Sequence, residues 1–433
     1  MPKVLVVGAG GREHAIVRAL LRSSTLAGAD GGAAGQIHVT PGNPGIADDV
    51  TVHDVAVDDI AGLVALAREL AVDLVAVGPE VPLVAGLVDA LGEAGIAAFG
   101  PSAAAARLEG SKAFAKEIMI AANVPTAGYE TVTTVDAGIS AITGYPVVLK
   151  YDGLAAGKGV VIAEDEQTAR ATLVDMLEDH QFGDAAVVVE EFLVGEEVSL
   201  LAICDGERAI PLAPAQDYKR IFDGDEGPNT GGMGSYSPVV GIDAARVAEI
   251  SAQVHQPIVD ELKRRGIAFH GVLYAGLMID GDDVRVLEYN TRFGDPETQA
   301  VLPRLRSDLY ELMVASATRD GLADATLEWD ERWAVTLVLA SAGYPASASK
   351  GDVISGLDAV ADAIEITHAG TARDADGRIV TAGGRVLNVT ALGAAPADAR
   401  AASYAAAEGI DFDGRQLRTD IALRPVERFA AEA

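Results

Sequence analysis

The segment VRVLEYNTRFGDPET, residues 284–298, constrains this chain more than any other part of its sequence. Its first half is rich in valine and leucine and favours a buried β-strand. That strand ends in Glu288 and Asn290, two oxygen-bearing side chains on one face. Such ligands suit a hard cation that keeps phosphate oxygens as partners, and Arg292 adds a donor fork for carboxylate or phosphate. The segment predicts a metal–phosphate site; the alternative, an edge strand with solvated polar residues, fits the apolar half poorly.

Length and composition favour a multidomain α/β enzyme. A chain of 433 residues is too long for one core, and 49% hydrophobic residues with only 5% aromatics suit close packing of helices on sheets. The net charge of −31 should repel nucleic acid and anionic membranes, so we expect small-molecule partners only. Any phosphate site must then be a local island of positive charge. The simplest explanation of the acidic surface is solubility.

Cysteine content and the absence of targeting segments predict a cytoplasmic protein. Cys204 is the single cysteine, and its apolar surroundings predict a buried thiol. The sequence shows no signal peptide and no apolar run of membrane-spanning length.

The pattern of strands and helices divides the chain into four units and a connection. Residues 1–101 alternate strand and helix and predict a doubly wound, Rossmann-like parallel-sheet domain. The pattern predicts a helical connection at residues 102–124 and a small α/β unit at residues 125–192. Residues 193–327 show a mainly antiparallel α+β pattern, and 328–433 form a C-terminal α/β unit.

The first glycine-rich turn, GAGGREHA at 8–15, follows a buried strand and opens a helix, where backbone amides can hold phosphate. A dinucleotide fingerprint would need glycine where Glu13 stands, so NAD binding is disfavoured. A sugar-phosphate site and a plain tight turn both remain open.

Two further loops lie at predicted carboxyl ends of parallel strands, where ligand crevices form. They are PGNPG at 41–45 and GPE at 78–80. Asn43 and Glu80 could bond sugar hydroxyls there, although such loops are often only turns.

The segment KYDGLAAGKGV, residues 150–160, predicts a glycine loop over a triphosphate. It offers Lys150, Lys158 and unhindered backbone amides. It is not a P-loop, because Lys158 precedes Gly159 and a strand. The alternative is a β-hairpin with a long connection.

Two other segments suggest nucleotide contacts and a functional loop. The backbone of 191–193 could pair with an adenine edge, and Glu197 could hold ribose hydroxyls. Residues 227–238, GPNTGGMGSYSP, predict a long polar loop, and loops of this length are usually functional or disordered.

Taken in order, these segments resemble the ATP-grasp ligases, and more closely their phosphoribosylamine–glycine ligase family. RFGDPE is the most characteristic match, and the likeness covers essentially the whole chain. The matching segments are GAGGREHA, PGNPG, VGPEVPLV, LEGSKAF, GLAAGKGV, EEFLVGEE, GPNTGGMGSYSP, GVLYAGLM, EYNTRFGDPETQ, WDER and THAGT. One departure is Tyr151, where the family usually has alanine, so the phosphate-loop entrance is expected to differ in shape.

The resemblance implies a role for each matching residue. Glu288 and Asn290 would hold Mg²⁺ or Mn²⁺, and Arg292 and Lys158 would act in catalysis. The implied contacts of the co-substrate ATP are Lys112, Lys150, Gly157, Lys158, Glu190, Glu191, Phe192, Leu193 and Glu197. The implied substrate contacts are Gly10, Gly11, Asn43, Glu80, Asp217 and Arg292, with Asp217 for the glycine ammonium.

The resemblance also implies a reaction and an assembly. A monomer would join glycine to 5-phosphoribosylamine in purine biosynthesis, with ATP converted to ADP and phosphate through glycyl phosphate, and 125–192 would be the lid. The alternatives are a formate-dependent transformylase or imidazole ribonucleotide carboxylase of the same superfamily, or a nicotinamide-dependent oxidoreductase.

Overall fold

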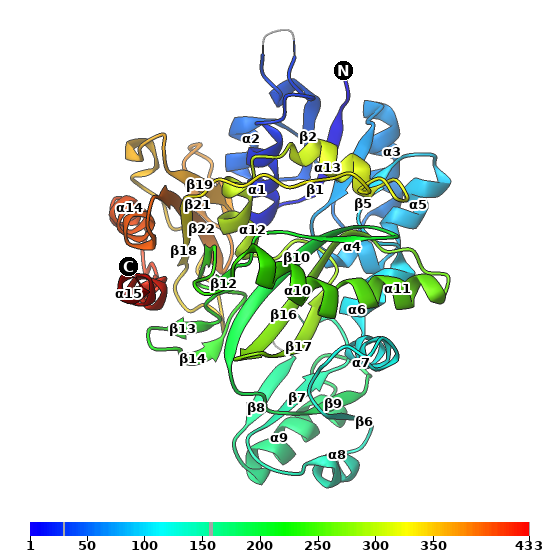
Figure 1. Cartoon of the computed structure of the whole chain (residues 1–433). Coiled ribbons are helices and arrows are strands. Elements are labelled where there is room, and N and C mark those ends of the chain that lie inside the picture. The colour runs from blue at the N-terminus through cyan, green and yellow to red at the C-terminus, as the bar shows by residue number, and fades with distance from the viewer. Residues whose placement is uncertain (29–30, 156–158, 433) are drawn as a thin grey trace.

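Three outer units surround a central one in this protein (Figure 1). The structure is a computed structural model that describes residues 1–28, 31–155 and 159–432. The N-terminal unit lies at the top of the view, the C-terminal unit at the left and the small lid at the bottom. Within these described ranges, no helix has the length and apolar character that crossing a membrane would need.

The N-terminal unit is a five-stranded parallel sheet in the order β3-β2-β1-β4-β5. Its strands are β1 (Val4–Gly8), β2 (Ile37–Pro41), β3 (Thr51–Val52), β4 (Leu74–Val77) and β5 (Ala98–Phe99). Its helices are α1 (Gly11–Leu20), α2 (Pro44–Asp49), α3 (Ile60–Leu70), α4 (Glu80–Val84) and α5 (Leu87–Glu93). Strand β1 is buried on both faces, as expected where helices cover both sides of a parallel sheet. The predicted doubly wound domain is confirmed.

Two helices, α6 (Ala103–Gly110) and α7 (Lys112–Ala121), lead to the lid, as the sequence predicted. The lid sheet is antiparallel in the order β6-β9-β7-β8. Its elements are β6 (Tyr129–Val132), β7 (Val147–Tyr151), β8 (Val160–Ala163), β9 (Val187–Glu191), α8 (Val135–Ala141) and α9 (Glu166–Leu177). Sequence reasoning missed β6, because two of its four residues are exposed and the strand shows no apolar run.

Tyr151 lies inside the lid core. Its side chain is buried, and its ring centroid lies 5.5 Å from that of Phe182. A Cβ atom at Gly153 would lie 2.6 Å from the Tyr151 ring. The residue therefore fills space beneath the start of the glycine loop.

The central sheet is antiparallel in the order β11-β10-β16-β17. Its strands are β10 (Glu196–Asp205), β11 (Ala209–Pro211), β16 (His270–Asp280) and β17 (Asp283–Asn290), and α10 (Ala244–Val254) and α11 (Gln256–Arg264) contribute to its apolar core. Cys204 is fully buried in this core, as predicted, and burial raises the pKa of its thiol.

The C-terminal sheet has the order β12-β15-β18-β22-β19. Its strands are β12 (Gln216–Asp217), β15 (Gly234–Ser237), β18 (Trp333–Ala340), β19 (Glu365–His368) and β22 (Arg385–Gly393). Two of these strands come from the segment that the sequence assigned to the central unit. The expectation of one long loop over 227–238 was wrong, because this segment contains β15 and part of β14.

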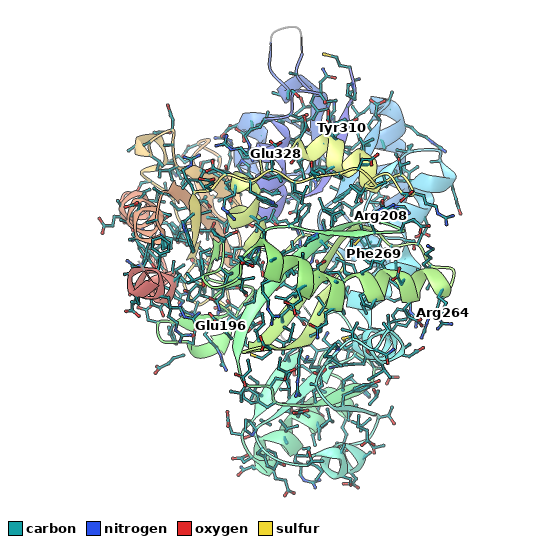
Figure 2. The ribbon with its side chains drawn as sticks, viewed as in Figure 1. Glu196, Arg208, Arg264, Phe269, Tyr310 and Glu328 are labelled. Atoms are coloured by element: carbon teal, nitrogen blue, oxygen red, sulfur yellow. The ribbon has the colours of Figure 1, made fainter. Side chains whose placement is uncertain are left out.

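Smaller elements complete the structure. Two hairpins are formed by β13 (Arg220–Phe222) with β14 (Glu226–Asn229), and by β20 (Thr371–Arg373) with β21 (Ile379–Thr381). The remaining helical elements are η1 (Ala34–Gln36), α12 (Glu297–Val301), η2 (Leu302–Arg304), α13 (Leu309–Ser316), η3 (Leu357–Ala359), α14 (Pro396–Glu408) and α15 (Leu423–Glu432). Glu196, labelled in Figure 2, pairs with Arg428 of α15 at 2.7 Å and so joins the central and C-terminal units.

Candidate functional site

A β-bulge in β17 aims the predicted metal ligands. Gly276 of β16 lies opposite Glu288 and Leu277 lies opposite Val286, so Leu287 is an extra residue in the ladder. Val286 packs in the apolar core of the central unit, and strict alternation would place Glu288 on that same face. The bulge reverses the alternation and turns Glu288 and Asn290 away from the core, as bulges beside active sites commonly do. Lys150 stabilises it by donating from Nζ to the Leu287 carbonyl at 2.8 Å.

Glu288 is an ionised carboxylate without a direct protein partner. Burial opposes its ionisation, but the charges of Lys150 and Lys112 outweigh burial and lower its pKa. Within the part of the chain that the structure describes, no hydrogen bond or ion pair engages its oxygens. The Asn290 Oδ1 accepts a bond from Arg292 Nη2 at 3.3 Å. This donor set fits a hard cation.

The same two residues cannot complete a metal site by themselves. The described residues contain no group of three or more histidine, cysteine, aspartate or glutamate side chains arranged to hold a metal. A cation at Glu288 and Asn290 would therefore need phosphate oxygens or water as further ligands, which is how Mg²⁺ is usually bound beside nucleotides.

Two buried lysines share one carboxylate beside this strand. Lys150 Nζ and Lys116 Nζ each lie 3.0 Å from Glu190 Oε2. An ammonium has three donors, and Lys150 uses two of them on Glu190 and Leu287. One donor remains for a phosphate oxygen, so the geometry supports the predicted nucleotide contact of Lys150.

Lys116 is a residue that sequence reasoning missed. Its side chain is buried, and it donates to Thr126 Oγ1 at 2.7 Å, which in turn donates to the Val286 carbonyl of β17. Burial lowers the pKa of Lys116 to about 8, although Glu190 favours the charged form. The available signal was a lysine on the apolar face of α7, between buried neighbours such as Ala115 and Ile118.

The start of the glycine loop is fixed to helix α7. Lys112 Nζ donates to the Gly153 carbonyl at 3.1 Å. Asp152 Oδ1 accepts bonds from Ser111 Oγ at 3.0 Å and from the Ala113 amide at 3.1 Å. These contacts place Lys112 beside the loop. The other two loop residues of the prediction, Gly157 and Lys158, lie outside the described residues.

The predicted adenine hinge follows β9. Within the described part of the chain, the backbone groups of Phe192 and Leu193 have no hydrogen-bond partner, whereas the Glu191 amide donates to Gly128 at 2.9 Å. Glu190 is buried, and its Oε1 atom has no partner among the described residues. Free peptide groups beside a buried acceptor suit a nucleobase edge, as the sequence suggested.

Glu197 and Asp217 meet at one cation. Lys219 Nζ lies 2.8 Å from Glu197 Oε1 and 2.8 Å from Asp217 Oδ2. Burial raises the pKa of Glu197, and Lys219 opposes that rise. Both carboxylates therefore already have a partner, and their contacts with ribose and glycine remain predictions.

Arg292 joins the end of β17 to the N-terminal unit. Its Nη2 lies 2.7 Å from Glu109 Oε1, and its Nε lies 3.5 Å from Glu80 Oε2. The buried guanidinium keeps a raised pKa: burial would lower the value, but these two carboxylates outweigh it. Glu109, which also accepts from the Thr291 amide at 2.8 Å, was absent from the predicted set.

The glycine-rich turn after β1 is occupied by Glu13. The Gly10 amide donates to Glu13 Oε2 at 2.6 Å, and a Cβ at Gly78 would lie 2.2 Å from Glu13 Oε1. This carboxylate fills the space between the ends of β1 and β4, where a dinucleotide pyrophosphate would lie. Gly11 is buried beside Asn388.

Asn43 acts locally in the loop after β2. Its Oδ1 caps α2 by accepting from the Ile46 amide at 3.0 Å. Its Nδ2 donates to the carbonyls of Ala9 at 2.9 Å and His368 at 2.8 Å. The side chain holds together the loops after β1 and β2, while its contact with a substrate remains a prediction.

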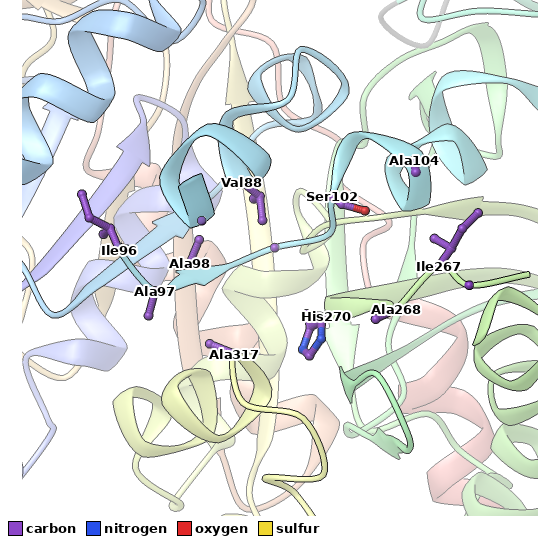
Figure 3. A pocket seen from close by; sticks show the side chains of 13 residues that line it. Val88, Ile96, Ala97, Ala98, Ser102, Ala104, Ile267, Ala268, His270 and Ala317 are labelled. Carbon is purple, nitrogen blue, oxygen red and sulfur yellow. The ribbon is translucent and has the colours of Figure 1, made fainter. Parts of the chain in front are cut away.

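A separate pocket of about 370 Å³ lies between the N-terminal and central units (Figure 3). It is lined mainly by small and apolar residues, and His270 contributes its one ring, whose Nδ1 bonds to the Ser316 carbonyl at 2.6 Å. None of the predicted site residues lines it.

Comparison with known proteins identifies the family. Three domain models of phosphoribosylglycinamide synthetase match in order: the N domain at residues 2–109, the ATP-grasp (A) domain at 110–298 and the C domain at 334–424. The chain belongs to this family. A phosphoribosylamine–glycine ligase of Streptomyces coelicolor is 52% identical over 430 residues, covering 98% of this chain and 99% of that protein.

Solved structures agree with this assignment. The crystal structure of phosphoribosylamine–glycine ligase from Thermotoga maritima is 32% identical, has a TM-score of 0.82, and covers 97% of this chain and 100% of that one. A Campylobacter jejuni biotin carboxylase in its β-γ-ATP complex matches with a TM-score of 0.69 and 16% identity, covers 99% of this chain and 95% of that one, and shows the fold alone. The predicted ATP-grasp fold and the predicted class, an ADP-forming ligase of purine biosynthesis, are confirmed.

Lys116 should give the ligase a pH-dependent affinity for ATP. As the pH rises through about 8, Lys116 loses its proton and Glu190 keeps only one cationic partner. The pocket becomes less positive, so the KM for ATP should rise. In Lys116→Met the KM should be raised at every pH, without this inflection. Steady-state kinetics between pH 6.5 and 9.5 measure the KM for ATP of both proteins. The variant Lys263→Met, at an exposed lysine, is the control.

Stability should change in the opposite direction over the same range. The folded-state pKa of Lys116 lies below its ordinary value of 10.5, so the unfolded chain binds the extra proton and folding stability gains from rising pH between about 8 and 10.5.

A wild-type KM for ATP that does not change between pH 7 and 9 would contradict the role given to Lys116.

Proposed function

We propose that this ligase joins glycine to 5-phosphoribosylamine, with ATP converted to ADP and phosphate through a glycyl phosphate intermediate. The observation that carries the proposal is the bulged end of β17, where an unpartnered Glu288 faces the charges of Lys150, Lys112 and Arg292. The family of the chain and the activity named for its relatives support this choice of substrates.

Activation of glycine requires charge neutralisation more than covalent help from the protein. A carboxylate is a poor electrophile, so its oxygen first attacks the γ-phosphorus of ATP and ADP leaves. Lys150 offers its remaining donor to the phosphates, and Lys112 adds a second charge. Mg²⁺ or Mn²⁺ held by Glu288 and Asn290 would neutralise phosphate charge. These groups are positioned before the reaction, which is the main source of such catalysis.

The second step forms the amide bond. The ribosylamine nitrogen attacks the acyl carbon of glycyl phosphate, the bond from that carbon to the phosphate oxygen breaks, and inorganic phosphate leaves. Arg292 follows the end of β17 and is fixed between Glu80 and Glu109. Its guanidinium can stabilise the departing phosphate. The lid of residues 125–192 would exclude water, because an acyl phosphate hydrolyses readily.

The N-terminal loops supply the side that receives the ribosylamine. The turns that contain Gly10, Gly11 and Asn43 lie at the carboxyl ends of neighbouring parallel strands, where such folds bind ligands. Asp217, already paired with Lys219, is the candidate for the glycine ammonium. We expect the protein to be a monomer whose partners are small molecules.

The sequence left two other classes of reaction open. A nicotinamide-dependent oxidoreductase would need room at the turn after β1, and Glu13 fills that space. A formate-dependent transformylase or an imidazole ribonucleotide carboxylase would share the ATP site and differ in its carboxylate substrate.

Substrate selection tests the proposal directly. With 5-phosphoribosylamine generated in situ, ADP release should depend on glycine and should not occur with formate or bicarbonate. Alanine should be a poor substrate, because an enclosed acyl phosphate leaves little room beyond Cα. A coupled assay of ADP measures each rate; equal rates with formate and glycine would reject the proposal.

Glu288→Gln should abolish turnover in a folded protein. The substitution removes the charge that would bind the cation and retains the size of the side chain, so the loss should reach at least about a hundredfold. Asp283→Asn, at the exposed start of the same strand, is the matched control and should keep full activity. Near-normal rates of Glu288→Gln at saturating Mg²⁺ would show that the metal assignment is wrong.

A further inference from the structure

Arg385, at the start of β22, is a side chain of the C-terminal unit that reaches the site. Its Nη2 pairs with Asp295 Oδ2 at 3.0 Å, and its Nη1 donates to the Asp295 carbonyl at 2.8 Å. The same Nη1 donates to the Gly231 carbonyl. One planar guanidinium therefore bridges two segments that lie far apart in the sequence.

The Gly231 turn is held by the C-terminal unit on both of its sides. While its carbonyl accepts from Arg385, its amide donates to the hydroxyl of Tyr344 at 3.0 Å. The next residue, Gly232, has φ +110°, and a Cβ there would lie 2.4 Å from Pro296 Cδ. The turn thus packs directly on the residue that follows Asp295.

This turn also fixes the backbone of Lys219. The amide and the hydroxyl of Thr230 donate to the Lys219 carbonyl at 2.7 Å and 2.8 Å. Lys219 in turn holds Asp217 and Glu197, the candidates for glycine and ribose contacts. These bonds do not involve Arg385, so the glycine and nucleotide side of the site keeps its own anchor when Arg385 is replaced.

On its other side, Arg385 fixes a carboxylate that faces the N-terminal loops. Asp295 Oδ1 accepts from Gln299 Nε2 at 2.8 Å, and its Oδ2 lies 3.7 Å from where a Cβ of Gly10 would stand. Burial opposes the ionisation of Asp295, but Arg385 and Arg12 outweigh it and lower its pKa. An ionised carboxylate is thus directed toward the turn expected to receive the ribosylamine.

We propose that Arg385 is a positioning residue that fixes Asp295 against the Gly231–Gly232 turn, so that the C-terminal unit completes the ribosylamine side of the site. This inference rests on the proposed function. Lysine at 385 has a single ammonium nitrogen, so it would not reproduce the planar two-nitrogen fork with which Arg385 contacts the Asp295 carboxylate and two carbonyls. Arginine at this position fixes two segments at once.

The experiment compares Arg385→Ala and Arg385→Lys with wild type, and with Arg378→Ala, an exposed arginine of the C-terminal unit, as control. The kcat/KM for the ribosylamine should fall about ten- to a hundredfold in both Arg385 variants, as expected for lost charged hydrogen bonds. The KM for ATP should stay within about twofold. Added guanidinium should restore part of the activity of Arg385→Ala, whereas Arg378→Ala should keep wild-type activity with or without it.

A double substitution separates positioning from general stability. On an Asp295→Asn background, Arg385→Ala should cost much less than it costs alone, because the two side chains act as one unit. Melting temperatures identify any variant that fails to fold. If Arg385→Ala fails, Arg385→Lys is compared with wild type instead, because lysine keeps the charge and most of the side chain.

Two results would overturn the inference. One is full activity of Arg385→Ala; the other is an equal loss for all three substrates without rescue by guanidinium. A wild-type protein that releases no ADP with glycine and the ribosylamine would instead reject the proposed function itself.

Discussion

The hydrogen bond from Lys150 to the Leu287 carbonyl is the contact on which the site depends. It joins the lid to the extra residue of β17, and that residue determines which face Glu288 presents. Lys116 and Thr126 make a second link from α7 to the same strand. The lid and the proposed metal ligands are therefore held in one network, in which Glu190 is the shared carboxylate. Phosphate binding at Lys150 and cation binding at Glu288 are expected to favour each other.

A chain with a net charge of −31 must concentrate positive charge to bind a triphosphate. The site does so with cations whose long side chains are buried or engaged by carboxylates, such as Lys116, Lys150 and Arg292. Pairing each cation with a carboxylate favours its charged form in a low-dielectric setting, and it leaves a donor of Lys150 free for ligand. The same arrangement limits flexibility, because each removed partner would leave a buried charge uncompensated.

Local patterns predicted the parts of the site that lie on one element. The strand that carries Glu288 and Asn290, the doubly wound N-terminal sheet and the lid strands β7, β8 and β9 followed from runs of apolar residues. The bulge at Leu287 could not be predicted in this way, because simple alternation places Val286 and Glu288 on the same face of the strand. Arg385 was also missed, since its partners lie 154 and 90 residues away, and long-range pairing leaves no signal in a single sequence. The sugar contact of Asn43 stays a prediction, while the capping of α2 and the link between two loops by its side chain were not foreseen.

The central claim is that the bulged end of β17 holds the nucleotide-bound cation. A crystal structure with Mn²⁺ and a non-hydrolysable ATP analogue tests it most directly, because the anomalous signal locates the metal. The account predicts a peak within coordination distance of oxygens of Glu288 and Asn290, with phosphate oxygens completing the shell and Lys150 still bonded to Leu287. A metal bound away from Glu288, or a β17 that pairs without the bulge, would contradict it.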